Sequence, residues 1–470
     1  MPISSGRNAS IFALVAVSAA AVPGMTSAQQ VTGAYAAHFQ ILKIATSTYG
    51  QITQMAFGPD DYLYASTADK GVQKFGFSQV SGRIISRAVA SPINGLGIAF
   101  HGSEMYLSSF DGSIHKLTDN NHNGVWGETS KGELDVAIVT GIPTGDHNVD
   151  NLQVSGNTLY VGIGRRTING RNGAFSSGSM HDYGGSGFWS GGNGYTWGDA
   201  AYNGTISYIK DLTQVANTTG SANAYANTTL SRHLVMDDDS PYSIRAVNKL
   251  VVHSAGVRNP FGLALDQSGQ LYFTNNFNRT PTNANGTSGF GYLRDTFGTS
   301  FNQDVYDQAF KAFEGGDYGY ADDNWRGKVA MMSPFAPGYH RVRSLTFDNS
   351  FNPGPYTAYD PNGHVGLGPS SSPDGCSFWY SSLLPVELQG NMFVARYVGT
   401  NSTSDGSQSI TYGDIVAIQV SNGTVRRIAY GFDHPLAVLA TSQDRLIVAT
   451  EGYTDGSGDH DRCLYTITVR

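Results

Sequence analysis

The chain repeats one pattern of hydrophobic and polar positions. A short alternating apolar segment is followed by a turn, then by an apolar or aromatic segment that ends in small polar residues. The copies begin at Met55, Ile98, Leu152, Leu263, Cys376 and Val438. Period-two alternation, with β-branched and aromatic residues around turn pairs, predicts six β-hairpins. A single hairpin cannot bury its own apolar face, so the repeat indicates units that stack against one another.

Six antiparallel units predict an all-β fold, a six-bladed β-propeller, because closing the units into a ring leaves only short edges. A β-sandwich, or two smaller β domains, is the alternative. The copies are unevenly spaced, and residues 165–250 and 275–345 are predicted to be long loop insertions on one face of the ring. Residues 307–313 are the one segment for which one or two helical turns are expected.

The first 28 residues have the pattern of a secretory signal peptide. Arg7 supplies the positive charge, residues 11–22 form a short apolar run, and residues 26–28 (TSA) resemble a cleavage site. The apolar run is too short to span a bilayer. We expect residues 29–470 to form a single propeller that is secreted and extracellular. Glycosylation motifs in surface loops fit this location, and they occur at Asn203, Asn217, Asn227, Asn278, Asn285, Asn401 and Asn422.

Composition narrows the function classes. The 58 glycines, 26 tyrosines and only 14% charged residues suit many short strands and turns. A formal net charge of −8 argues against nucleic acid and against an anionic membrane surface as partners. Outside the cell, the two cysteines, Cys376 and Cys463, favour a single disulfide. Two buried free thiols are the alternative.

Two segments carry candidate catalytic chemistry. His147 lies in a polar loop, residues 145–152 (GDHNVDNL), which leads into a predicted central strand. If the protein is an enzyme, we expect His147 to be its base; a structural histidine is the alternative. Arg258 begins residues 258–263 (RNPFGL), where a turn before a core strand would point a fixed cation towards a pocket rim. A surface ion pair is the alternative for Arg258.

Two further segments are candidate cation sites. Residues 119–128 (DNNHNGVWGE) carry oxygen side chains at alternating positions, then glycine, as in a short calcium loop. A solvated, asparagine-rich turn is the alternative. Residues 315–320 (GGDYGY) predict a tight turn because glycine permits positive φ. This turn either aims carbonyls at a cation or merely reverses the chain.

Taken together and in order, these motifs resemble the glucose/sorbosone dehydrogenase family, the soluble quinoprotein propellers. The resemblance rests on residues 117–124, 145–152, 256–263, 315–319, 368–375 and 389–395. It implies a six-bladed propeller, in agreement with the repeat. It also implies oxidation of a sugar hydroxyl by pyrroloquinoline quinone (PQQ), with Ca²⁺ holding the cofactor.

The resemblance implies a role for particular residues. The family's base falls on His147, which would take the hydroxyl proton while the carbon gives hydride to the quinone. The quinone-contacting arginine falls on Arg258, with Asn259 beside it at the cofactor. The backbone carbonyls that bind the cofactor's calcium fall near Phe277 and Asn278.

The chain departs from the family pattern at several cofactor contacts. Arg165 stands where soluble glucose dehydrogenases have an acidic residue. Val398 stands where they have a lysine, with Arg396 two residues away. Their later arginine pair falls near His434 and Leu436. Either Arg165 and Arg396 bind the cofactor carboxylates instead, or this branch uses the site differently.

The first functional hypothesis is therefore a secreted PQQ- and Ca²⁺-dependent sugar dehydrogenase that passes electrons to an external acceptor. The second hypothesis, motivated by the changed contacts, is a propeller that binds carbohydrate or a protein partner without redox chemistry. A third is a hydrolytic propeller of the lactonase kind, with calcium at a carboxylate-rich centre. It ranks last because the candidate loops hold few carboxylates.

Overall fold

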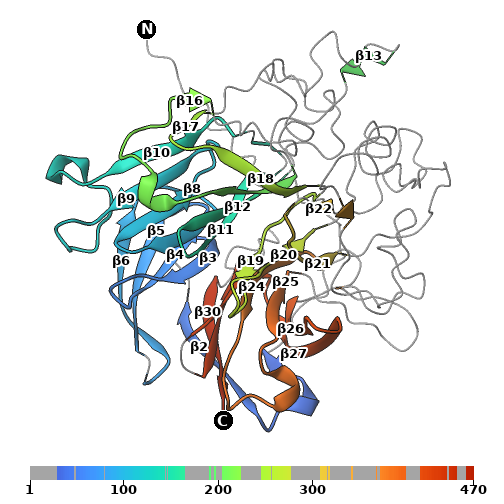
Figure 1. Ribbon diagram of the computed structural model, residues 1–470. Coiled ribbons are helices and arrows are strands. Elements are labelled where there is room, and N and C mark those ends of the chain that lie inside the picture. The colour runs from blue at the N-terminus through green and yellow to red at the C-terminus, as the bar shows by residue number, and fades with distance from the viewer. Residues whose placement is uncertain are drawn as a thin grey trace.

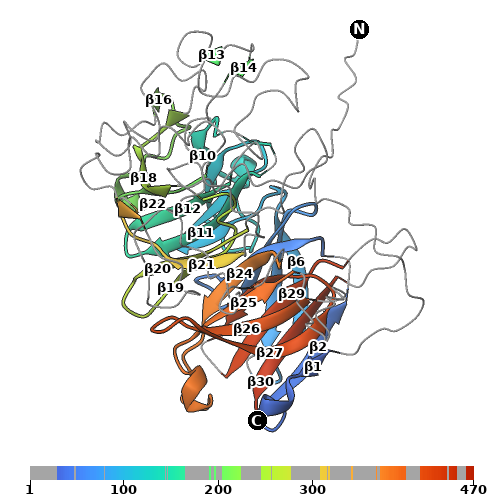
Figure 2. The same ribbon diagram turned by 90° about the vertical axis from the view of Figure 1, so that its right-hand side faces the viewer.

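The computed structural model describes residues 29–46, 49–78, 80–142, 144–145, 147–164, 190–191, 195–196, 204–223, 245–255, 257–276, 307–314, 316–317, 340–341, 367, 371–397, 413–441, 444–452 and 462–470. Within them the chain is an all-β, six-bladed propeller (Figures 1 and 2). The helical segments in these ranges are short 3₁₀ turns: η1 (Gly33–Tyr35), η2 (Thr129–Lys131), η3 (Leu212–Gln214) and η4 (Val386–Leu388). No described helix is long and apolar enough to cross a membrane.

Each blade is one sheet, numbered here in chain order from its innermost strand. Blade 1 consists of β3 (Ile52–Phe57), β4 (Leu63–Thr67), β5 (Val72–Ser78) and β6 (Arg83–Ser91). Blade 2 consists of β7 (Ile98–His101), β8 (Glu104–Ser108), β9 (Ile114–Thr118), β10 (Asp135–Thr140), β17 (Arg245–Ala246) and β16 (Ala222–Asn223). Blade 3 consists of β11 (Val149–Ser155), β12 (Thr158–Ile163), β15 (Thr205–Ile209), β18 (Leu250–Ala255), β22 (Gly316–Asp317) and β23 (His340–Arg341).

The remaining blades complete the ring. Blade 4 consists of β19 (Leu263–Leu265), β20 (Leu271–Asn275) and β21 (Gln308–Lys311). Blade 5 consists of β24 (Pro373–Phe378), β25 (Met392–Arg396), β26 (Gly413–Gln419), β27 (Thr424–Phe432) and β1 (Gln30–Val31). Blade 6 consists of β28 (Pro435–Ala440), β29 (Arg445–Thr450), β30 (Cys463–Val469) and β2 (Phe39–Thr46). A separate two-stranded pair is formed by β13 (Ser190–Gly191) and β14 (Tyr195–Thr196).

The ring closes through the two ends of the described chain. Strand β2 pairs antiparallel with β30, so blade 6 joins N-terminal and C-terminal segments. Strand β1 adds to the outer edge of blade 5 through β27. Each innermost strand contacts the innermost strand of the next blade, and β28 returns to β3. Closure protects the inner edge of each described blade, because only short strands face the centre of the ring.

The hydrophobic core lies between blades. Among the described residues, six apolar clusters each join side chains of two neighbouring blades. Between blades 5 and 6, for example, Phe432 of β27 packs edge-on against Tyr465 of β30 at 5.4 Å. Burial of one large apolar side chain contributes about 1.5–3 kcal/mol, so a blade is stabilised mainly by its two neighbours. This dependence confirms the stacking that the repeat predicts.

The predicted hairpins are confirmed in all six blades, since every copy of the repeat forms the first two strands of a blade. The helical prediction for residues 307–313 is wrong, because Gln308–Lys311 is strand β21. Phe310 is fully buried there and stacks on Phe273 at 5.2 Å. The two predicted insertions also contain strands. Strands β15 and β17 lie inside residues 165–250, and β21 lies inside residues 275–345.

The predicted disulfide is wrong as well. Cys376 in β24 and Cys463 in β30 are two separate buried thiols. Cys376 belongs to the core between blades 4 and 5, whereas Cys463 belongs to the core between blades 5 and 6. The body of blade 5 therefore separates them.

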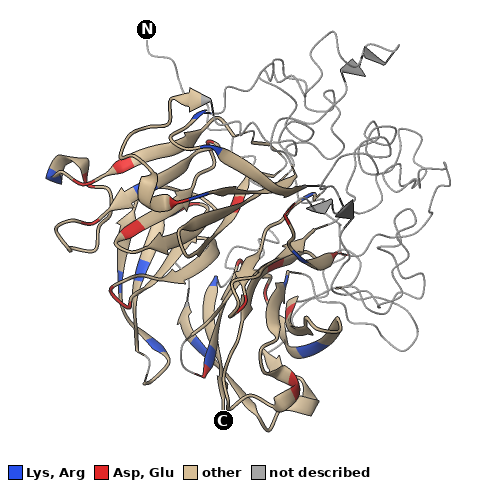
Figure 3. Cartoon of the chain, in the orientation of Figure 1, with Lys and Arg blue, Asp and Glu red and all other residues tan. Residues whose placement is uncertain are grey.

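Basic and acidic residues are interspersed along the described strands and loops (Figure 3), in line with the modest net charge.

Candidate active site

One face of the ring collects the candidate residues. In an antiparallel hairpin, the start of the first strand and the end of the second lie at the same end. Because all six blades begin with such a hairpin, these positions meet on one side of the ring, which we call the site face. Its described polar residues include His147, Asp150, Arg258, Asn259, Asn275, Asn276, Asp374, Tyr397, His434 and Glu451.

The repeat register explains why His147 and Arg258 come together. Leu152 pairs with Val161 in blade 3, and Leu263 pairs with Phe273 at the equivalent position in blade 4. His147 precedes Leu152 by five residues, and Arg258 precedes Leu263 by five. The imidazole and the guanidinium thus stand at equivalent positions of neighbouring blades.

His147 is packed against the end of the hairpin. A methyl group on Gly164 would lie 2.3 Å from His147 Cβ, 3.0 Å from Asn259 Oδ1 and 3.1 Å from Asp150 Oδ2. The three side chains therefore surround Gly164, which has to be glycine for them to approach so closely. The backbone N–H of Gly164 also donates to the carbonyl of Asn148 at 2.9 Å. This bond ties the loop of His147 to strand β12.

Electrostatics keep His147 neutral. The residue is half-buried overall, but its Nε2 atom is buried. Burial, followed by the positive charge of Arg258, holds the pKa of His147 well below its usual value. At neutral pH the imidazole is therefore unprotonated, which is the form that can accept a proton.

Arg258 is fixed by the asparagines that end β20. Asn275 Oδ1 accepts hydrogen bonds from the backbone N–H groups of Arg258 and Asn259, each at 3.0 Å. Arg258 Nη1 donates to the carbonyl of Asn276 at 3.1 Å, and Arg258 is 9% exposed. The guanidinium is thus held beside the backbone that precedes Phe277. Phe277 itself, and Asn278, lie outside the described residues.

A second cluster surrounds Asp374 in blade 5. Asn276 Nδ2 donates to Asp374 Oδ1 and to Ser372 Oγ, both at 3.1 Å. The N–H of Ser372 donates to Asp307 Oδ2 at 2.7 Å. Burial, partly offset by the Asn276 hydrogen bond, raises the pKa of Asp374 well above its usual value. The carboxylates of Glu451 and Asp307 act in the same direction as burial.

A third cluster joins blades 5, 6 and 1. Gln51 Nε2 donates to Glu451 Oε1 at 2.7 Å, and the rings of Tyr397 and His434 lie 4.4 Å apart. His434 Nδ1 contacts Asp433 Oδ1 at 2.6 Å. Burial raises the pKa of Glu451, and a hydrogen bond with Tyr397 opposes that rise. The site face therefore holds several carboxyl groups that are costly to ionise.

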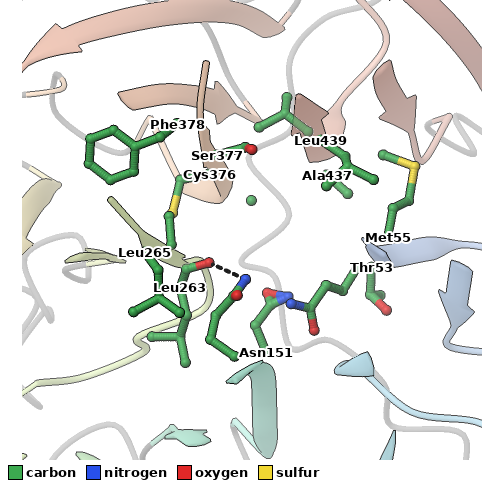
Figure 4. A pocket seen from close by; sticks show the side chains of 15 residues that line it. Thr53, Met55, Asn151, Leu263, Leu265, Cys376, Ser377, Phe378, Ala437 and Leu439 are labelled. Atoms are coloured by element: carbon green, nitrogen blue, oxygen red, sulfur yellow. Dashed lines mark hydrogen bonds between the residues drawn. The ribbon is translucent and has the colours of Figure 1, made fainter. Parts of the chain in front are cut away.

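The middle of the site face is apolar. One cluster unites buried side chains from four blades: Leu96, Phe261, Tyr397 and Leu436, with Phe110 packed against them. Deeper in the ring, a cavity of about 150 Å³ with both polar and apolar lining residues lies along the inner strands of five blades (Figure 4). Met55, Asn151, Leu263 and Cys376 are among its lining residues. Polar groups thus ring an apolar patch that is wide enough to involve several blades.

The other predicted cofactor residues have different outcomes. Arg396 is buried and pairs through two nitrogens with the carboxylate of Asp414, Nε at 2.7 Å, while its third nitrogen reaches the carbonyl of Leu367. This arrangement favours a structural role for Arg396 over contact with a cofactor. His434 lies in the third cluster and Leu436 in the apolar one. Arg165 and Val398 lie outside the described residues.

The asparagine-rich candidate loop is not part of the site face, because it follows the end of β9 on the opposite side of the ring. In residues 119–128, Asp119 Oδ2 accepts from the N–H of Gly124 at 2.8 Å, and Asn123 Oδ1 accepts from that of Val125 at 2.7 Å. These bonds are those of an asparagine-rich turn that satisfies its own backbone. From the segment 315–320, Gly316–Asp317 forms β22, which pairs parallel with β18; its other residues lie outside the described residues.

Sequence analysis missed the buried carboxylates. Asp150 is 1% exposed and Asp374 is 3% exposed. The repeat did contain a signal for these carboxylates. Asp150 lies two positions before Leu152, and Asp374 lies two positions before Cys376, the first residues of the third and fifth copies of the repeat. The equivalent residues in the other blades are Thr53, Leu96, Phe261 and Leu436. A carboxylate at a position that is otherwise mostly apolar marks it as unusual.

Comparison with known proteins supports the fold. No protein-family model matches the chain, and no curated protein matches it. Among solved structures, the iodide and calcium structures of Trichoderma reesei Carbohydrate-Active Enzymes Family AA12 share 13% identity with it at a TM-score of 0.55. They are covered over 98% and 97% of their length, against 94% of this chain. The holo form of the pyranose dehydrogenase PQQ domain from Coprinopsis cinerea also shares 13% identity, at a TM-score of 0.51, over 95% of this chain and 98% of that one.

Proposed function

We propose that the protein is a secreted quinoprotein sugar dehydrogenase that oxidises a sugar hydroxyl by hydride transfer to PQQ, with His147 as base. The observation that carries this proposal is the pairing of His147 and Arg258 at equivalent positions of neighbouring blades, close enough for one charge to act on the other. A neutral imidazole beside a fixed guanidinium suits proton abstraction coupled to charge development on an acceptor.

The residues of the site face fit an anionic quinone and its calcium ion. Arg258 offers a buried cation for an oxygen or carboxylate of PQQ, and Asn259 lies next to it. The apolar cluster of Leu96, Phe261 and Leu436 suits a planar ring. When bound, PQQ supplies the two-electron acceptor, and the protein supplies placement and electrostatics. The backbone near Phe277 and Asn278 would hold the calcium, and Arg165 would bind a cofactor carboxylate.

The role of His147 follows from its surroundings. Its loop is tied to β12, its ring nitrogen Nε2 is buried, and its lowered pKa keeps it unprotonated. In the proposed reaction it takes the hydroxyl proton of a sugar, and an external acceptor later removes the electrons. Extracellular location is part of the proposal. The described glycosylation motifs, at Asn217 and Asn422, are on exposed residues as glycosylation requires.

The test is reconstitution. Purified protein is loaded with PQQ and CaCl₂ and offered a panel of aldoses with an artificial electron acceptor. Turnover that is lost in His147→Gln but kept in His101→Gln supports the proposal, because His101 lies at the opposite end of β7. Absence of turnover on the whole panel rejects it. Carbohydrate binding that survives His147→Gln, without turnover, favours the non-redox alternative.

A second candidate function gains support from one observation. The third hypothesis ranked last for want of carboxylates, yet Asp150, Asp374 and Glu451 all lie on the site face. A carboxylate-rich centre is what a calcium-dependent lactonase needs to hold its metal and activate water. Hydrolysis of a sugar lactone panel by calcium-loaded, PQQ-free protein distinguishes this function from the dehydrogenase.

A further inference from the structure

Two buried oxygen atoms beside His147 lack a hydrogen-bond partner within the described ranges. They are Asp150 Oδ2 and Asn259 Oδ1. Their residues are 1% and 5% exposed. The two oxygens lie 3.1 and 3.0 Å from the same point, the position that a methyl group on Gly164 would occupy. Two buried acceptors near one point, neither with a donor, leave a place that a cation can fill.

Leaving these two buried oxygens without partners costs the folded state substantial free energy. An unsatisfied buried acceptor costs about 1–3 kcal/mol, and more when it is charged. Asp150 is the more costly of the two, since a buried carboxylate without a counter-charge is strongly disfavoured. The backbone of Asn259 is held in place, because its N–H donates to Asn275 Oδ1 at 3.0 Å. A bound cation offsets both costs at once.

We propose that Asp150 and Asn259 bind a calcium ion on the site face, beside His147. A carboxylate and an amide oxygen are typical calcium ligands, and six to eight oxygens at about 2.3–2.6 Å complete the shell. Waters, or hydroxyl oxygens of a sugar, supply the remainder. The site does not require a quinone, and its protein ligands are side-chain oxygens, unlike the backbone carbonyls that the family resemblance implies for the cofactor's calcium.

Other carboxylates of the chain contrast with this pair. Asp119 in the asparagine-rich turn has both oxygens occupied by its own backbone, at 3.1 and 2.8 Å. Asp414 is paired with Arg396. Asp150 is a buried carboxylate with an unpartnered oxygen, and an unpartnered oxygen of Asn259, from the next blade, lies near the same glycine. Asp119 therefore provides the matched control.

The test titrates CaCl₂ into purified, PQQ-free protein and follows heat by calorimetry, with Tb³⁺ luminescence as a second probe. We expect a site that is weakened at least about 100-fold in Asp150→Asn, the upper range for losing even an outer-shell partner. Asn259→Ala weakens it as well, and Asp119→Asn leaves it unchanged. Calcium raises the melting temperature of wild type but not of Asp150→Asn, which stays folded in EDTA because its buried charge is gone.

Three results overturn the proposal. They are no calcium binding up to millimolar concentration, binding that is unchanged in Asp150→Asn, or binding that disappears in Asp119→Asn. None of these readouts uses sugar oxidation, so the calcium site and the proposed dehydrogenase activity can fail independently. If Asp150→Asn does not fold, Asn259→Ala carries the test, since it retains the carboxylate and removes only the amide ligand.

Discussion

Gly164→Ala is expected to inactivate the protein although it replaces no polar group. The added methyl would lie 2.3 Å from His147 Cβ, whereas ordinary contact begins at 3.4 Å. The two groups therefore have to separate by about 1 Å, and because Gly164 is tied to the loop by its backbone hydrogen bond, His147 moves. A misplacement of about 1 Å costs on the order of 100-fold in rate.

The assay is kcat for sugar oxidation by PQQ- and calcium-loaded protein, with melting temperature measured alongside. We expect kcat to fall about 100-fold, while overpacking costs about 1–3 kcal/mol of stability. Gly33→Ala is the control, since a methyl group at Gly33 meets no atom within 4 Å. Full activity of Gly164→Ala would refute the packing of His147 against this glycine, and full activity of both Gly164→Ala and His147→Gln would refute the role of the histidine.

Three further outcomes are expected. Arg396→Ala lowers the free energy of unfolding by about 3–5 kcal/mol in denaturant titration, since it leaves Asp414 buried without its cation; a loss below about 1 kcal/mol would argue against the structural pair. Asp374→Asn stabilises the EDTA-treated protein at pH 7 and not below about pH 4. In the wild type, the raised pKa of Asp374 means that the folded state binds this proton more tightly than the unfolded state does, so the free energy of unfolding falls as pH rises above about 4. Thermal unfolding of both proteins across this pH range would contradict the prediction if their relative stabilities did not change. The pH–rate profile of kcat/KM stays flat from neutral pH upward and declines only in acid, because the lowered pKa keeps His147 neutral; a decline between pH 7 and 6 would contradict it.

The propeller could be predicted from the sequence because the same hairpin pattern occurs six times along the chain. Apolar alternation around Met55, Ile98 and Leu152 recurs in every blade, so errors in one copy do not change the fold. Strand β21 escaped because Gln308–Lys311 is a four-residue strand, and its burial depends on Phe273 in a neighbouring strand. The disulfide was predicted only because the protein was expected to be extracellular. The two thiols are not joined to each other because they lie in different cores, on either side of blade 5.

The candidate site was readable only in part. His147 and Arg258 could be found from their motifs, and the register of the repeat accounts for their proximity. Asp150 and Asp374 were missed because a single acidic residue before a strand usually faces water. Their burial arises from ring closure, which turns six strand starts inward. Arg396 was assigned to the cofactor by position, but Asp414, eighteen residues later, holds it instead.

Direct binding of PQQ is the measurement closest to the central claim. Absorbance titration of the quinone into purified, calcium-loaded protein should saturate at one PQQ per chain. Arg258→Met should abolish saturation while the fold is retained by circular dichroism. A titration that never saturates, or one that Arg258→Met leaves unaltered, would show that the guanidinium and imidazole of the site face serve some other purpose.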